Sequence, residues 1–225
     1  MNINVFASSS AGNSYQVGNL LIEAGVPIKK IKQSLNYKLS SILGCLISHC
    51  HGDHVKGAKA LIKAGVDCFV SHETAQAVGL KGHRLHIIKP LHQFQIGKWS
   101  IKPFSLIHDV PCLGFIISNG KEKILFATDT NYIPYRFKGL THIMLGVDYD
   151  ADFLKDNVTD GLVDTGRAKR TLQNHMSIQT AKDFFRANDM SKVREIYLLH
   201  LSSVNSNSEM FKAQIEAITG RPVYV

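Results

Sequence analysis

The stretch SHCHGDH, residues 48–54, follows the apolar run SILGCLIS and precedes a helical pattern. Three histidines and one aspartate fall within its last six positions. Residues two apart in an extended chain point the same way, so His49 and His51 can aim at one point. The turn at the following glycine brings Asp53 and His54 toward a second point. Imidazole and carboxylate are ligands that suit zinc, iron and manganese, so the stretch predicts a metal-binding loop.

Polar residues also close three other apolar runs. His108 ends SIKPFSLIH, Asp129 ends KILFATD and His200 ends REIYLLH. Side chains at the carboxyl ends of strands converge on one edge of a sheet, so these residues can complete two metal sites with the loop. A histidine-rich loop without metal is the alternative, but its crowded titratable groups would repel one another and lose hydration.

Short apolar runs alternate with helical patterns along the whole chain, which favours layered sheets flanked by helices. Strands are expected within residues 3–8, 14–25, 41–48, 67–71, 93–107, 113–129, 142–148, 194–202 and 222–225. Helices are expected at Ile28–Leu35, His54–Ala64, Thr74–Leu80, Ser177–Asn188 and Asn207–Ile218. Asn119-Gly120 between two apolar runs predicts a hairpin. We find no repeat or linker and expect one domain over residues 1–225.

Composition sets the broad class of the protein. The chain has 225 residues, 44% of them hydrophobic and 20% charged, which excludes disorder and fibrous structure. Four cysteines stand singly, as expected of free thiols in a reducing compartment. The start shows no signal-peptide pattern, and no apolar run approaches a membrane span. We expect a cytoplasmic protein without a membrane partner, and leave self-association open.

The motif set resembles the metallo-β-lactamase superfamily over essentially the whole chain. That resemblance implies a four-layer αβ/βα sandwich, of class α+β or α/β. It also implies that His49, His51 and His108 hold one metal, that Asp53, His54 and His200 hold the other, and that Asp129 bridges them. Zinc is the first expectation for both metals, with manganese and iron as alternatives.

Further segments are similar to the YycJ/WalJ-type hydrolases, which are associated with exonuclease-like action on DNA and are related to tRNase Z. They are FASSSAGNS at residues 6–14, HDVPCLGF at residues 108–115, Tyr149-Asp150, and HMS at residues 175–177. Departures from the family pattern fall at Glu23, Gly146, Asp148 and Asn174. Glu23 replaces an aspartate and is one methylene longer, so any bond it makes to the metal loop must be rearranged.

The resemblance implies a binuclear metal-dependent hydrolase, and most directly a phosphodiesterase or nuclease acting on DNA or RNA. A hydroxide bridging the metals would attack the phosphorus. Asp53 would orient the attacking water as well as bind metal. His175 is our candidate general acid for the leaving oxygen, and a plain flanking residue beside a helix cap at Ser177 is the alternative.

Substrate contacts are expected at Asn13, Ser14, Ser177, Arg167 and Arg170. The chain carries 26 Lys and Arg against 18 Asp and Glu, an excess of +8, and this suits a polyanionic partner such as nucleic acid or a nucleotide. An ordinary solvated basic face is the alternative. Two other functions remain open: hydrolysis of a cyclic nucleotide, thioester or lactone on the same metals, and nucleotide binding without hydrolysis.

Overall fold

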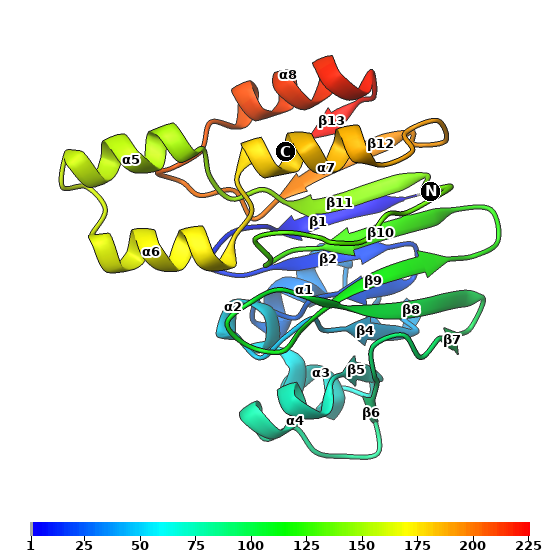
Figure 1. Ribbon diagram of the computed structural model, residues 1–225. Coiled ribbons are helices and arrows are strands. Elements are labelled where there is room, and N and C mark those ends of the chain that lie inside the picture. Colours follow the sequence, from blue (N-terminus) through cyan, green and yellow to red (C-terminus); the bar gives the residue numbers. More distant parts are fainter. Residues whose placement is uncertain (1) are drawn as a thin grey trace. The chain divides into compact units, whose positions relative to one another are not determined.

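A computed structural model describes residues 2–225 as two compact units. The first unit holds the described residues up to Ser105 together with Val110–Leu113, and the second holds Leu106–Asp109 and Gly114–Val225. Both units mix strands and helices along the chain (Figure 1), as the alternating patterns predict. Whether the two units together form the single domain expected over residues 1–225 stays a prediction.

The first unit is built on a six-stranded sheet in the order β1-β2-β3-β4-β5-β6. Its strands are β1 Ile3–Ala7, β2 Ser14–Val17, β3 Leu20–Ile22, β4 Gly44–Leu46, β5 Cys68–Val70 and β6 Leu85–Ile87. Pairs β1–β2 and β2–β3 are antiparallel, while β3 to β6 run parallel. Strand β6 was not expected from the sequence, because its side chains are half-buried or exposed and its apolar pattern is short.

Helices pack on this sheet through one apolar cluster. The unit contains α1 Ile28–Ser34, η1 Leu39–Ser41, α2 Gly52–Val55, α3 Ala58–Lys63 and α4 His72–Val78, besides β7 Phe94–Ile96 and most of β8 Trp99–Leu106. Ile31 of α1, Leu61 of α3 and Ala75 of α4 pack with Cys45 and Val70 of the strands. The helix predicted at His54–Ala64 is wrong in one respect, because it is broken between α2 and α3.

Gly57 explains that break. Its amide donates to the carbonyl of Ala24, 2.6 Å away, rather than to the preceding turn of helix. A Cβ at this position would lie 2.5 Å from the carbonyl oxygen of Val26, so no other residue fits without movement. The chain therefore docks against the end of β3 here, and α2 stays a single turn.

The second unit has its strands in the order β13-β12-β11-β10-β9. They are β9 Cys112–Ser118, β10 Lys123–Ala127, β11 His142–Gly146, β12 Glu195–Leu199 and β13 Val223–Tyr224, of which the first residues of β9 belong to the first unit. β9 and β10 form the predicted hairpin, with Asn119 Oδ1 accepting from the amides of Lys121 and Glu122. The remaining pairs are parallel, so β10, β11 and β12 end at the same edge.

Four helices complete the second unit. They are α5 Ala151–Thr159, α6 Thr165–Asn174, α7 Ile178–Ala187 and α8 Ser208–Thr219, and α5 and α6 lie side by side beyond the ends of the strands (Figure 1). The sequence predicted α7 and α8 but not α5 and α6, which carry few buried residues. Their signals are the caps Asp150 and Asp164, whose side chains accept from Asp152 and Arg167 amides. No helix among residues 2–225 is long and apolar enough to cross a membrane.

Candidate metal centre and its supports

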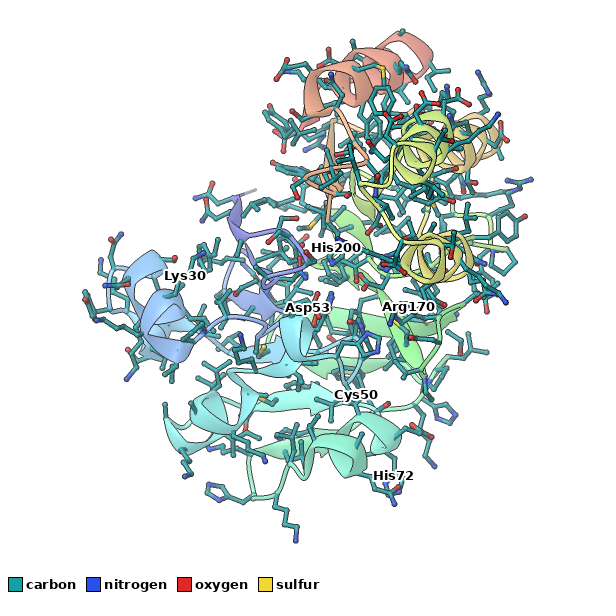
Figure 2. The ribbon with its side chains drawn as sticks, turned by 90° about the vertical axis from the view of Figure 1, so that its left-hand side faces the viewer. Lys30, Cys50, Asp53, His72, Arg170 and His200 are labelled. Carbon is teal, nitrogen blue, oxygen red and sulfur yellow. The ribbon has the colours of Figure 1, made fainter. Side chains whose placement is uncertain are left out.

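In the first unit, three imidazoles and one carboxylate gather after β4. His49 and His54 are fully buried, and their ring centroids lie 4.2 Å apart. His49 Nε2 lies 3.1 Å from His51 Nδ1, and His54 Nε2 lies 3.3 Å from Asp53 Oδ2. Figure 2 labels Asp53 on the short helix α2 and Cys50 on the loop before it. The convergence that the extended segment and the glycine turn predict is present within this unit.

Two buried polar side chains, one just before β2 and one just after β3, hold this loop. Asn13 Nδ2 lies 3.3 Å from Asp53 Oδ2 and 3.2 Å from His54 Nε2. The Glu23 carboxylate accepts from the amide of Ser48 at 3.3 Å, and its Oε1 lies 3.5 Å from His54 Nδ1. Glu23 has a φ of 63°, a left-handed conformation that is strained for this residue type. The Glu23 side chain therefore reaches the metal loop from a left-handed backbone position.

His49 has supports of its own on the opposite side of the ring. Its Nδ1 lies 2.8 Å from Ser48 Oγ and 3.6 Å from Cys112 Sγ. The amide of Leu113 donates to the carbonyl of Ser48 at 3.0 Å, which ties residues 112–113 to the loop. Because the Nδ1 side of the ring is engaged in this way, Nε2 is the nitrogen of His49 that would bind a metal.

In the second unit, His108, Asp129 and His200 follow β8, β10 and β12, as the sequence predicts. Asp129 is buried, and its carboxylate oxygens lie 3.9 Å from His108 Nε2 and 3.9 Å from His200 Nε2. Ligand atoms of Asp129, His175 and His200 all lie within 4.8 Å of one another. His200 has a φ of 59°, so the chain leaves β12 through a left-handed residue at a ligand position.

Asp148 is a residue of this cluster that the sequence reasoning did not place in the site. Its Oδ1 accepts from His200 Nδ1 at 2.6 Å and lies 2.9 Å from His175 Nδ1. The two rings are stacked, with centroids 5.5 Å apart and planes 10° apart. Asp148 follows the apolar strand β11 just as Asp129 follows β10, and that parallel was the available signal.

Burial and charge act in opposite directions on the histidines of this unit. Burial lowers the pKa of His108 below its usual value, although the carboxylates of Asp129 and Asp109 oppose this. Burial also acts to lower the pKa of His175, but the carboxylate of Asp148 outweighs it and raises that pKa above the usual value. Burial therefore decides the direction of the pKa shift at His108, whereas the Asp148 carboxylate decides it at His175.

Residues expected to contact substrate lie in different environments. Asn13 and Ser14 are fully buried, and Asn13 supports the metal loop. Ser177 is buried and caps α7 by accepting from the amide of Thr180, the structural role considered for it. Arg167 and Arg170 are exposed on α6, where Figure 2 labels Arg170. Of these five residues, only the two arginines are therefore exposed.

The donor set suits a divalent cation in both units. In the first unit the loop contributes three imidazoles and a carboxylate, and in the second the strand ends contribute imidazoles and Asp129. Asp148 Oδ2 is buried and makes no hydrogen bond within residues 2–225. Neutral imidazoles with carboxylates are the usual zinc ligands, so these residues fit a resident metal.

Comparisons with known proteins agree with this chemistry. The exodeoxyribonuclease WalJ of Streptococcus pneumoniae serotype 2 (strain D39 / NCTC 7466) is 27% identical, over 92% of this chain and 83% of the relative. The exodeoxyribonuclease YycJ of Bacillus anthracis is 23% identical, over 97% of this chain and 89% of the relative.

Solved structures share the fold. The metallo-β-lactamase fold protein YhfI of Bacillus subtilis superposes with a TM-score of 0.75 at 16% identity, covering 99% of this chain and 94% of that one. The short form of human tRNase Z superposes with a TM-score of 0.62 at 16% identity, covering 90% and 93% of the two chains. The expected mixed α/β fold with two sheets is confirmed.

The family model described as the beta-lactamase superfamily domain matches residues 19–201, which is most of the chain and includes every predicted metal ligand. The chain therefore belongs to the beta-lactamase superfamily, in its metallo-β-lactamase branch.

Proposed function

We propose that this metal-dependent hydrolase is a nuclease that cleaves phosphodiester bonds of DNA, working inward from an end. The observation that carries the proposal is similarity along nearly the whole chain to two exodeoxyribonucleases, in a sequence that keeps histidine or aspartate at every predicted ligand position. An excess of +8 in charge is consistent with a polyanionic substrate.

Seven residues form the proposed binuclear centre. One metal would be held by His49, His51 and His108 and the other by Asp53, His54 and His200, and Asp129 would be a ligand of both. Two divalent cations held there, zinc in the first instance, would lower the pKa of a bound water and offset negative charge on a phosphoryl oxygen.

Two side chains are proposed to orient the attacking water and to donate a proton to the leaving group. Asp53 Oδ2 lies 3.3 Å from His54 Nε2. Besides binding metal, the Asp53 carboxylate would accept a hydrogen bond from the attacking water and so orient it. His175 turns Nδ1 to Asp148, which leaves Nε2 to donate a proton to the departing sugar oxygen. Its side chain is partly exposed, so a substrate can reach it.

Substrate phosphates are proposed to bind α6. The helix sequence TGRAKRTLQN contains three basic residues and no acidic one. Arg167 and Arg170 would pair with backbone phosphates upstream of the scissile bond, and a guanidinium can do so with two parallel hydrogen bonds. Asn13, Ser14 and Ser177 are proposed to shape the site indirectly, because each is buried.

An activity screen on metal-loaded protein tests the proposal. End-labelled single-stranded DNA, blunt duplex, RNA and a cyclic nucleotide are each incubated with zinc-loaded or manganese-loaded protein. We expect progressive shortening of DNA, and we expect Asp129→Asn to abolish it while exposed Asp156→Asn leaves it unchanged. Turnover of the cyclic nucleotide alone, or tight binding without turnover, would overturn the nuclease in favour of the two other functions considered.

The acid role of His175 needs a separate measurement. His175→Ala should slow esters with poor leaving groups far more than p-nitrophenyl esters, whose leaving oxygen needs no proton. Equal losses on both substrate types would contradict the role of a proton donor. Metal content is read by elemental analysis in the same preparations, so a variant that merely loses metal is recognised.

A further inference from the structure

Exposed apolar side chains lie directly beside the ligand positions of the second unit. Tyr132 is 52% exposed and Ile107 is 47% exposed, although both are large and apolar. Ile107 immediately precedes His108, and Tyr132 is three residues beyond Asp129. The two side chains thus offer exposed apolar area next to the proposed metal ligands, and apolar surface at such a place can bind a ligand.

Hydrogen bonds hold the two residues together. The amide of Ile107 donates to Thr130 Oγ1 at 3.1 Å, and Thr130 Oγ1 donates to the carbonyl of Tyr132 at 2.9 Å. The amide of Asn131 donates to the carbonyl of Ile107 at 3.4 Å. Thr130 is fully buried, so these hydrogen bonds are internal, whereas the side chains of Ile107 and Tyr132 are exposed. The surface they form is prearranged rather than a chance feature of a loose loop.

The segment that carries Tyr132 is basic. Residues 130–147 contain Arg136 and Lys138 but no aspartate or glutamate, and both basic side chains are exposed. Tyr135, 38% exposed, lies between Tyr132 and Arg136 in the chain. Aromatic rings interleaved with cations are typical of surfaces that bind single-stranded nucleic acid, where bases stack on the rings and the cations follow the phosphates.

We propose that Ile107 and Tyr132 form a stacking platform for an unpaired nucleobase, which selects single-stranded DNA ends at this site. The proposal rests on the nuclease function proposed above and specifies its substrate. A base stacked on Tyr132 places the adjoining phosphate toward His108 and Asp129, whose side chains lie 3.9 Å apart at Nε2 and Oδ2. A base that remains paired in a duplex cannot offer its face to the ring.

Binding measurements without turnover test the platform. Fluorescence anisotropy of a labelled single-stranded oligonucleotide is recorded with protein kept in a chelator, so that nothing is cleaved. Tyr132→Ala should weaken binding by about 5- to 150-fold, which is the range for loss of one stacked base. Tyr132→Trp should restore it. Tyr224→Ala serves as the matched control, because Tyr224 is 46% exposed and lies on β13 at the far edge of the sheet of this unit.

An abasic scan separates stacking from a general disturbance of the surface. At one position of the oligonucleotide, removing the base should weaken binding to the wild-type protein by the same factor as Tyr132→Ala. The variant should then be insensitive to that removal. Arg136→Gln should instead weaken all strands alike and lower the salt dependence by about 0.7 in log–log slope, as expected for one lost phosphate contact.

The outcomes distinguish the platform from the nuclease itself. If wild-type protein shortens DNA but Tyr132→Ala binds single strands as tightly as wild type, the platform is refuted and the nuclease stands. Equal affinity of wild type for blunt duplex and single strands would also refute it. If wild type neither binds nor cleaves DNA, both proposals fail together.

Discussion

Removing the carboxylate of Asp148 tests whether one oxygen positions two histidines. In Asp148→Ala, the 2.6 Å hydrogen bond from His200 Nδ1 and the 2.9 Å contact with His175 Nδ1 are both lost. A hydrogen bond to a charged group contributes about 1.5–3 kcal/mol. Loss of a carboxylate that orients a metal-binding histidine typically lowers metal affinity 10- to 100-fold, or about 1.4–2.8 kcal/mol.

The free energy of the lost hydrogen bond and that of the lost metal affinity fall in the same range, so we expect zinc to bind Asp148→Ala about 100-fold more weakly. Asp148→Asn keeps an acceptor oxygen without the charge, and we expect a loss of roughly tenfold. The side chain of Asp148 is almost completely buried, so solvent screens this interaction little.

Competition between the protein and a chromophoric chelator measures the affinity directly, without any substrate. Thermal unfolding of the metal-free proteins reports separately on folding. Asp156→Asn, an exposed carboxylate on α5, is the matched control and should bind zinc as wild type does. Wild-type affinity in a folded Asp148→Ala protein would refute the positioning role.

Further substitutions and conditions have definite expected results. Gly25→Ala would place a Cβ against a backbone carbonyl of the metal loop, so we expect it to lower the free energy of unfolding by at least about 3 kcal/mol in chemical denaturation. Gly52→Ala has open space around its Cβ and should be tolerated. Equal stability of the two variants would contradict this steric argument. Burial lowers the pKa of His142 in the folded state, so its neutral form contributes stability above about pH 6.5 that is lost as the pH falls. His142→Gln should therefore flatten the dependence of the unfolding free energy on pH between about pH 7 and 5. The control His83→Gln, at an exposed position, should leave that dependence unchanged. Glu23→Asp, which shortens the carboxylate under the metal loop, should weaken zinc binding in a chelator titration, and unchanged affinity would show that the reach of this side chain is unimportant. Removing metal from the wild-type protein should lower its melting temperature and restoration of zinc should recover it, because a ligand bound only by the folded state stabilises that state; an unchanged melting temperature would argue against a resident metal.

The metal loop and the strand-end residues were predictable because short spacings constrain local geometry. His49 and His51 point together as extended residues two apart must, and Asp129 and His200 meet because parallel strands end at one edge. Strong apolar periodicity likewise predicted α7 and α8. These features depend on patterns a few residues long, which a single sequence displays.

Other features depended on contacts that no short pattern encodes. Helices α5 and α6 bury little apolar surface, so the apolar periodicity of their sequences is weak. Their aspartate N-caps are the only clear sequence signal for them. The double contact of Asp148 arises from the packing of β11 against the segments that carry His175 and His200, which are distant in sequence. Asn13 was expected at the substrate, but burial places it under the metal loop.

The bonds from Asn13 to the metal loop also bear on the order of folding. They span 40 and 41 residues, and the amide of Asn13 itself donates to the carbonyl of Asp53 at 2.7 Å. Contacts of that sequence separation form only after a costly loop closure, whereas the short spacing of the histidines lets a nascent chain capture zinc early. Zinc added before refolding would therefore meet a flexible ligand loop, and zinc added afterward would meet a rigid one. The uptake rates of the two protocols should differ, which makes the N-terminal strands a determinant of how the protein acquires its metal.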